Sequence, residues 1–167
     1  TDKRVNLVTS AIWNKYKDLK ELKEADILDL EAIIRPLGSF RRKALYAKEM
    51  ARKLIDEYQG IVPKTHRELE EFKGVGRKVA NVVLSNIFDI PSFAVDTHVT
   101  RVSKRLNIVK ESDNVLTIEK TLMQYFPKDK WSRLHHQLVL FGRYKCKAAK
   151  PECVSCQLEK YCNYKKK

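Results

Sequence analysis

The sequence lacks several features that define whole classes of protein. No apolar run in its 167 residues approaches the roughly 18 that a membrane span requires, so we expect no transmembrane protein. The N-terminus carries no signal-peptide pattern, so we expect an intracellular protein. Glycine and proline number only five each, and no segment alternates apolar and polar residues long enough to predict a strand. The sequence therefore predicts an all-α fold.

Acidic residues are also scarce: 21 Asp and Glu stand against 34 Lys and Arg, a formal net charge of +13. The basic excess gathers in residues 41–53, 72–110 and 143–167, whereas the rest of the chain is slightly acidic. An even coat of solvated lysines would not be clustered in this way. This clustering favours a surface that binds a polyanion, because basic side chains that neutralise its phosphates release the counterions of the polyanion. We expect nucleic acid as the partner, with an anionic membrane surface as the alternative.

Apolar residues recur with helical spacing along most of the chain. These stripes fall at residues 5–19, 27–34, 44–58, 77–88, 99–106, 115–125 and 131–141. Thr65 and Glu68 predict a capping box at the start of a short helix. From Cys146 the composition becomes Lys- and Cys-rich, without a long stripe. We therefore expect a helical domain over 1–142 and a distinct loop over 143–167.

All four cysteines lie in that loop, as Cys146, Cys153, Cys156 and Cys162, with the spacing C-x6-C-x2-C-x5-C. Because the four cysteines are so close in sequence, they are not residues scattered through a hydrophobic core. Nothing in the sequence indicates the oxidising compartment that disulfides need. Four thiolates are typical of structural zinc, although such sites usually bring two close pairs and only Cys153 and Cys156 form one. The uneven spacing equally suits a 4Fe-4S cluster. Spacing alone leaves both metals open.

A glycine turn, Phe72-Lys73-Gly74-Val75-Gly76-Arg77-Lys78, precedes the apolar helix expected at 77–88. Glycines two apart permit a tight turn, and amides at a helix N-terminus can bind a phosphate. The alternative is a helix corner that uses glycine for steric relief. Lys78 would lie in the first helical turn, where the positive end of the dipole favours a neutral, nucleophilic amine. The alternative for Lys78 is a solvated surface lysine.

Asp96 precedes the stripe that starts at Val99, so it is predicted to be the N-cap of that helix. The same carboxylate could stabilise an oxocarbenium-like sugar or assist proton transfer. His98, His135 and His136 are interpreted as satisfied polar residues rather than metal ligands.

Three of these segments resemble the motifs of a known protein family. The run from Gly74 to Leu84, GVGRKVANVVL, resembles the helix-hairpin-helix of endonuclease III, and AVDTHVTRV, which contains Asp96, resembles its second signature. GRYKC, followed by the cysteine spacing, resembles its 4Fe-4S loop. The three motifs occur in order and cover about residues 34–164.

The resemblance implies a helix-hairpin-helix glycosylase fold, with the hairpin at about 65–88 and a 4Fe-4S cluster in the loop. It implies a base excision repair DNA glycosylase and AP lyase that acts on duplex DNA with oxidised pyrimidines or abasic sites and has no membrane partner. Lys78 and Asp96 are then the catalytic residues, and Cys146, Cys153, Cys156 and Cys162 ligate the cluster. The resemblance and the basic pattern assign DNA binding to Lys73, Gly74, Val75, Gly76, Arg77, His98 and Arg143. Related mismatch glycosylases generally lack a lysine at the position of Lys78.

Three departures from the family pattern stand out. Lys73 replaces a usual proline, and Ser39 lies where relatives place an apolar DNA-inserting residue. Thr1 resembles a point inside the family's helical domain, so either the sequence is incomplete or the chain is a shortened member. A shortened member is expected to self-associate or to need a protein partner. The rival hypotheses are a non-enzymatic DNA-binding module and a binding protein with a zinc loop.

Overall fold

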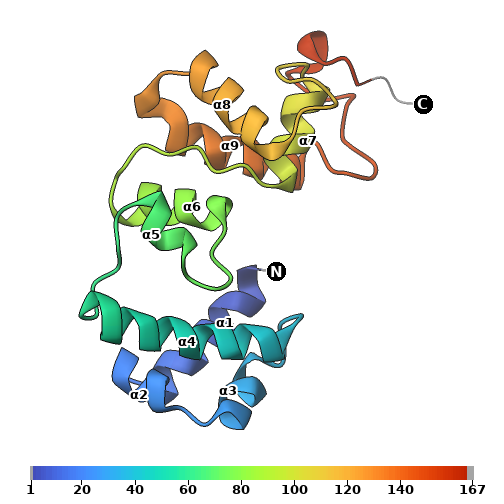
Figure 1. The fold of residues 1–167 in the computed structure, drawn as a ribbon. Coiled ribbons are helices and arrows are strands. Elements are labelled where there is room, and N and C mark those ends of the chain that lie inside the picture. Colours follow the sequence, from blue (N-terminus) through green and yellow to red (C-terminus); the bar gives the residue numbers. More distant parts are fainter. Residues whose placement is uncertain (1, 165–167) are drawn as a thin grey trace. The chain divides into compact units, whose positions relative to one another are not determined.

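The computed structural model describes residues 2–164; Thr1 and residues 165–167, the end of the expected loop, lie outside the described residues. All regular elements assigned within residues 2–164 are helices, and no strand is assigned there, which confirms the all-α prediction. In chain order the elements are α1 (Asp2–Lys15), α2 (Leu19–Glu24), α3 (Ile27–Ile34), α4 (Phe40–Tyr58), α5 (His66–Glu70), α6 (Arg77–Ile87), α7 (Thr97–Arg105), α8 (Val115–Tyr125), η1 (Lys128–Lys130), α9 (Trp131–Tyr144) and η2 (Glu159–Tyr161) (Figure 1). Among the described helices, none has the length and apolar character needed to cross a bilayer.

Local capping explains where several helices begin and end. The stripe at residues 5–19 is split between two helices, because Asp18 starts α2 by accepting a hydrogen bond from the Glu21 amide at 2.8 Å. Thr65 caps α5 through the Glu68 amide, as predicted. Gln59 and Gly60 both have positive φ, 55° and 79°, and end α4 in the left-handed conformation typical of helix C-termini.

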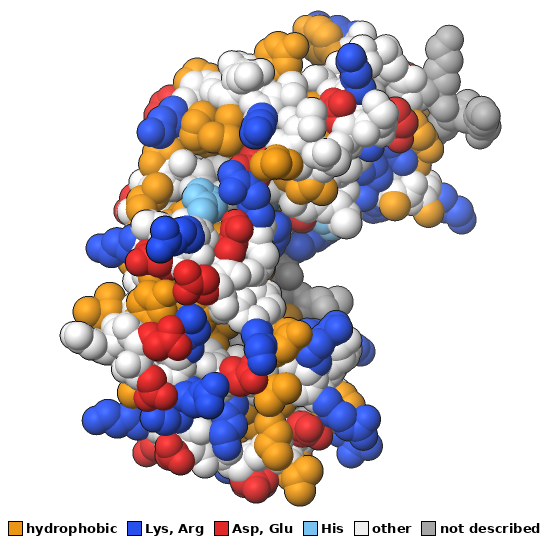
Figure 2. Space-filling model, viewed as in Figure 1, with side chains coloured by type: hydrophobic (Ala, Val, Ile, Leu, Met, Phe, Trp, Pro, Cys, Tyr) orange, Lys and Arg blue, Asp and Glu red, His pale blue; other side chains and the backbone are white. Residues whose placement is uncertain are grey.

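The chain divides into two compact units, Thr1–Gly76 and Arg77–Lys167, and the division falls at the end of the glycine turn. In the first unit α4 packs against α2 and α3, and α1 contacts α3. Its buried core consists of Val8, Tyr16, Leu22, Ala25, Leu30, Ile34, Ala44 and Ala51. On the face of this unit drawn in Figure 2, basic and acidic side chains are interspersed.

In the second unit α7 packs against α9 and contacts α8. Its buried core consists of Phe93, Val95, Val99, Val109, Ile118 and Leu122. Gly142 lets α9 approach α7 closely, because a Cβ at this position would lie 2.9 Å from the Cβ of His98. This unit contains Lys78, Asp96 and the four cysteines.

Candidate active site

Lys78 is the second residue of α6 and its side chain is exposed. The helix begins immediately after Gly76, and Ala80 and Leu84 anchor it in the interior. The first amides of a helix have no intrahelical acceptor and carry partial positive charge. Lys78 therefore presents its amine from a fixed helix end rather than from a loop.

Asp96 is the N-cap of α7, as predicted. Its Oδ1 accepts hydrogen bonds from the amides of His98 and Val99, both at 2.8 Å. No described residue donates a hydrogen bond to Oδ2. One carboxylate oxygen therefore holds the helix start, while the other remains available for chemistry.

Lys78 and Asp96 line the same groove, which has a volume of about 920 Å³. Three further cations line this groove, Arg101, Lys104 and Arg105, whereas Glu111 is the other acidic residue there. The charged side chains of the lining are thus mostly cationic, around a single candidate pair of amine and carboxylate. Such a groove suits a polyanionic substrate with an electrophilic carbon.

A series of contacts runs from α7 toward the first cysteine. His98 Nδ1 lies 3.2 Å from Arg101 Nη2, so the half-buried ring is satisfied within the protein. Arg101 also donates to the carbonyl oxygens of Gly142 at 2.6 Å and Cys146 at 3.1 Å. Arg101 therefore joins α7, α9 and the start of the cysteine loop.

The four cysteines are half-buried free thiols that line one cavity of about 470 Å³. Arg105 donates to Cys146 Sγ at 3.2 Å, and its guanidinium lies 3.9 Å from the centre of the Tyr164 ring. Within residues 2–164 no three His, Cys, Asp or Glu side chains are drawn tightly enough together to hold a single metal ion. Four thiols line this cavity together with the carboxylates Glu152 and Glu159, and four thiolates are the donor set typical of a 4Fe-4S cluster.

The glycine turn belongs to the first unit as far as Gly76. Gly74 has a φ of 84°, and a Cβ there would lie 2.6 Å from Tyr46 Cδ2, so this position requires glycine. The amide of Val75 donates to Phe72 O at 3.0 Å and closes the turn. Lys73 Nζ pairs with Glu49 at 2.9 Å.

Arg77, predicted to bind DNA, is engaged by a carboxylate of α8. Its Nη2 lies 2.7 Å from Glu119 Oε1, and the Glu119 side chain is only 3% exposed. Glu119 was not singled out from the sequence. The helical spacing nevertheless predicts that Glu119 is buried, because it lies on the same helix face as Val115, Ile118 and Leu122.

His135 is a satisfied core residue, as the sequence analysis interpreted it. Its Nδ1 lies 2.7 Å from the carbonyl oxygen of Ala94, two residues before Asp96. Burial is the main cause that lowers the pKa of His135 below its ordinary value of 6.5, although the bond to Ala94 opposes this shift. His136 is exposed.

The structure thus brings together two sets of predicted residues in the second unit: Lys78 with Asp96, and the four cysteines. Lys73, Gly74, Val75 and Gly76 lie in the first unit, while Arg143 is half-buried on α9. Sequence reasoning missed Arg101 and Arg105. Apart from the His98 ring beside Arg101, their polar partners are backbone carbonyls and a thiol more than 40 residues away, which no local pattern reveals.

Comparisons with known proteins give a consistent result. A family model described as HhH-GPD superfamily base excision DNA repair protein matches residues 1–128. Endonuclease III of Bacillus subtilis (strain 168) is 46% identical over 162 residues, which are 97% of this chain and 74% of that protein. Endonuclease III of Escherichia coli (strain K12) is 36% identical over 167 residues, 100% of this chain and 79% of that protein.

Comparison with solved structures also finds endonuclease III. An endonuclease III trapped as a covalent intermediate with DNA, in an estranged-adenine complex, has a TM-score of 0.94 and 47% identity. The match covers 98% of this chain and 76% of that one. A thermostable thymine-DNA glycosylase, with a TM-score of 0.83 and 24% identity, shares the fold.

Proposed function

The chain belongs to the HhH-GPD superfamily of base excision DNA repair proteins and, within it, to the endonuclease III family, and from this premise we propose that it is a bifunctional DNA glycosylase and AP lyase. Its substrate is duplex DNA that contains oxidised pyrimidines or abasic sites. The observation that carries the proposal is the groove that Lys78 and Asp96 share. A damaged base leaves the stack at a cost of a few kcal/mol, which is lowest for bases that stack poorly.

Lys78 is the nucleophile of this reaction. Its Nζ attacks the anomeric carbon, and the bond to the damaged base breaks with the electron pair leaving on the base. The Asp96 carboxylate stabilises the positive charge that develops on the sugar. The sugar ring opens as one amine proton passes to the ring oxygen, which leaves a protonated Schiff base between Nζ and C1′. The adjacent C2′ then gives a proton to the solvent, and the 3′ phosphate departs by β-elimination.

Phosphate contacts hold the duplex without reading its sequence. We assign them to Lys73, Gly74, Val75, Gly76, Arg77, His98 and Arg143. The cations that line the groove with Lys78, namely Arg101, Lys104 and Arg105, add to this set. The carboxylates paired with Lys73 and Arg77 leave those two cations with less net charge to offer a phosphate.

The loop over 143–167 is proposed to bind a 4Fe-4S cluster through Cys146, Cys153, Cys156 and Cys162. Support comes from four thiols around one cavity, one thiolate for each iron. When bound, the cluster cross-links a segment that has no helical core of its own. Arg105 and Arg101, which contact Cys146, connect that segment to α7.

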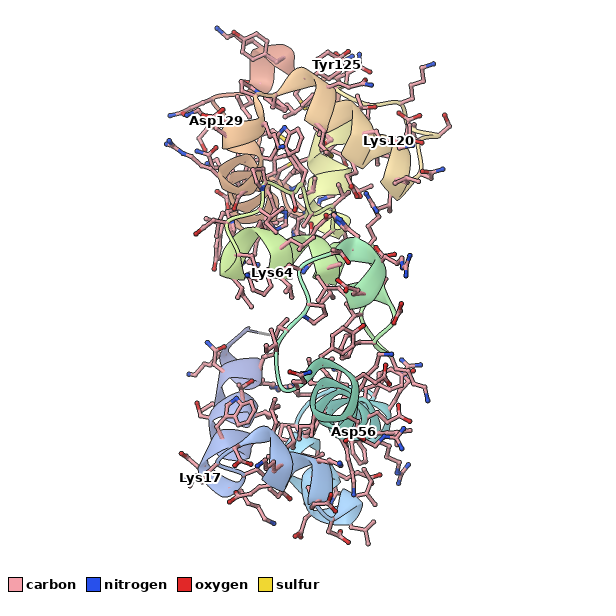
Figure 3. The ribbon with its side chains drawn as sticks, turned by 60° about the vertical axis from the view of Figure 1, so that its left-hand side comes forward. Lys17, Asp56, Lys64, Lys120, Tyr125 and Asp129 are labelled. Carbon is pink, nitrogen blue, oxygen red and sulfur yellow. The ribbon has the colours of Figure 1, made fainter. Side chains whose placement is uncertain are left out.

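Borohydride trapping on a duplex with a single abasic site tests the function. The iron-loaded protein is expected to form a covalent adduct, Lys78→Ala is expected to form none, and Lys120→Ala is expected to match the unmodified chain. Lys120 is a suitable control because it projects outward from α8 and lies outside the groove (Figure 3). No adduct, or an adduct that survives Lys78→Ala, would favour a non-enzymatic DNA-binding module.

The role of Asp96 needs a variant that separates capping from charge. Asp96→Asn keeps an oxygen that can accept the His98 and Val99 amides but removes the carboxylate charge. We expect base removal to slow severely while the melting temperature changes little. Base removal at the rate of the unmodified chain would refute the electrostatic role.

A further inference from the structure

We propose that Glu119 is a positioning residue for this reaction, a buried carboxylate that fixes Lys78 and Asp96 relative to one another. The inference rests on the proposed function. Glu119 lies on α8, whereas Lys78 begins α6 and Asp96 begins α7. The carboxylate does not line the groove, so it acts through other residues.

The first connection runs from Glu119 to the start of α6. Arg77 Nε lies 3.1 Å from Oε1 and 3.0 Å from Oε2 of Glu119, and Arg77 Nη2 lies 2.7 Å from Oε1. Two guanidinium nitrogens on one carboxylate constrain orientation as well as distance. Because Arg77 directly precedes Lys78, this pair sets the first turn that presents the amine.

The second connection runs from Glu119 to the segment before Asp96. Asn81 Nδ2 donates to Glu119 Oε2 at 3.1 Å and to the carbonyl oxygen of Phe93 at 3.2 Å. Asn81 is 1% exposed and lies one helical turn after Lys78, and Phe93 lies three residues before Asp96. Glu119 orients the Asn81 amide so that its nitrogen faces the Phe93 carbonyl.

A purely stabilising role would explain this arrangement less well. The Glu119 side chain is 3% exposed whereas that of Arg77 is 44% exposed, so the buried carboxylate incurs a desolvation cost that its partly solvated partner offsets only in part. Such a pair is a weak device for stability alone. Misplacing a reacting group by about 1 Å can cost roughly a hundredfold in rate. A network that reaches both elements of the catalytic pair is suited to preventing that displacement.

Glu119→Gln tests the role, because it keeps the size of the side chain but removes the charge and one of the two oxygens. The trapping rate is measured in single turnover on saturating abasic duplex, and affinity is measured on a duplex with a reduced abasic site. We expect the trapping rate to fall about tenfold to a hundredfold. Affinity should not fall by more than about twofold, because Glu119 lies outside the groove and the loss of its charge leaves Arg77 with more net charge to offer a phosphate.

Leu122→Ala is the matched control, because Leu122 is fully buried on the same helix and belongs to the core rather than the network. It is expected to lower the melting temperature yet keep the trapping rate of the folded protein. If Glu119→Gln does not fold, Asn81→Ala decides in the same assays, because it removes the bond to Phe93 and leaves the Arg77–Glu119 pair.

The outcomes are distinct. A Glu119→Gln chain that traps at the rate of the unmodified chain, or loses no more rate than Leu122→Ala, overturns the positioning role and leaves the proposed function standing. Loss of affinity in place of rate also overturns it. An unmodified chain that forms no adduct overturns the proposed function, and the positioning role falls with it.

Discussion

Gly142 should not tolerate even a methyl group. A Cβ there would lie 2.9 Å from His98 Cβ and 3.2 Å from Val102 Cγ2, and neither atom is the far end of a flexible chain. Alanine would gain about 1 kcal/mol of helix propensity. Overpacking costs about 1–3 kcal/mol. Displacement of the Gly142 carbonyl also disturbs its 2.6 Å bond from Arg101, a charge-assisted bond of a type that contributes about 1.5–3 kcal/mol. Overpacking and the disturbed hydrogen bond together exceed the propensity gain, and we expect Gly142→Ala to lose between about 1.5 and 5 kcal/mol.

Urea unfolding of the iron-loaded protein, followed by circular dichroism, measures this loss. For a chain of this size the melting temperature should fall by about 2–4 °C per kcal/mol. Val102→Ala removes one clashing methyl, so the double variant should lose less than the sum of the two single losses. Gly38→Ala is the control, because no heavy atom lies within 4 Å of its added Cβ. A Gly142→Ala chain as stable as the unmodified one would refute the close-packing argument.

Three further predictions follow from local geometry. Burial lowers the pKa of His135 in the fold, whereas the unfolded ring takes up a proton below its ordinary pKa of 6.5, so the free energy of unfolding should fall as pH drops from 6.5 toward the lowered pKa. The dependence of the urea midpoint on pH should weaken in His135→Asn and persist in His136→Asn. Gly74→Ala should cost about 1–3 kcal/mol in urea unfolding, because of its positive φ and Tyr46, whereas Gly76→Ala, with open space around it, should change stability by less than about 0.5 kcal/mol. Cys156→Ser should lower the iron and sulfide bound per chain and increase proteolysis of the 143–164 segment, as measured by metal analysis and limited digestion; full iron content would contradict the assigned ligands.

Local features of the sequence predicted most of the helices, because periodicity and capping act over one or two turns. The caps at Thr65 and Asp96 depend on amides two or three residues away. The break after α1 was missed because the apolar spacing continues through Tyr16 to Leu19, whereas Asp18 starts a new helix. Apolar periodicity indicates which face of a helix is buried, but it does not indicate where one helix ends and the chain changes direction into the next.

The supports of the candidate site could not be predicted in the same way. Arg77 and Glu119 are 42 residues apart, and His135 and Ala94 are 41 apart, so only the tertiary fold brings them together. A basic residue beside a glycine turn can pair with a phosphate or a carboxylate, and charge alone does not distinguish the two. Arg77 was assigned to phosphate for this reason, and the structure gives it a carboxylate as well.

The segment before Asp96 explains why polar side chains occur inside otherwise apolar helices. Phe93, Ala94 and Val95 are at most 4% exposed, yet they form no helix or strand that could satisfy their backbone groups. Buried carbonyls need donors, and Asn81 supplies one to Phe93 while His135 supplies one to Ala94. The two donors come from α6 and α9, so the position of Asp96 is set by helices on which it does not lie. A carboxylate held in this way can keep one oxygen for the cap and the other for the reaction, because the backbone that carries it does not depend on the cap alone.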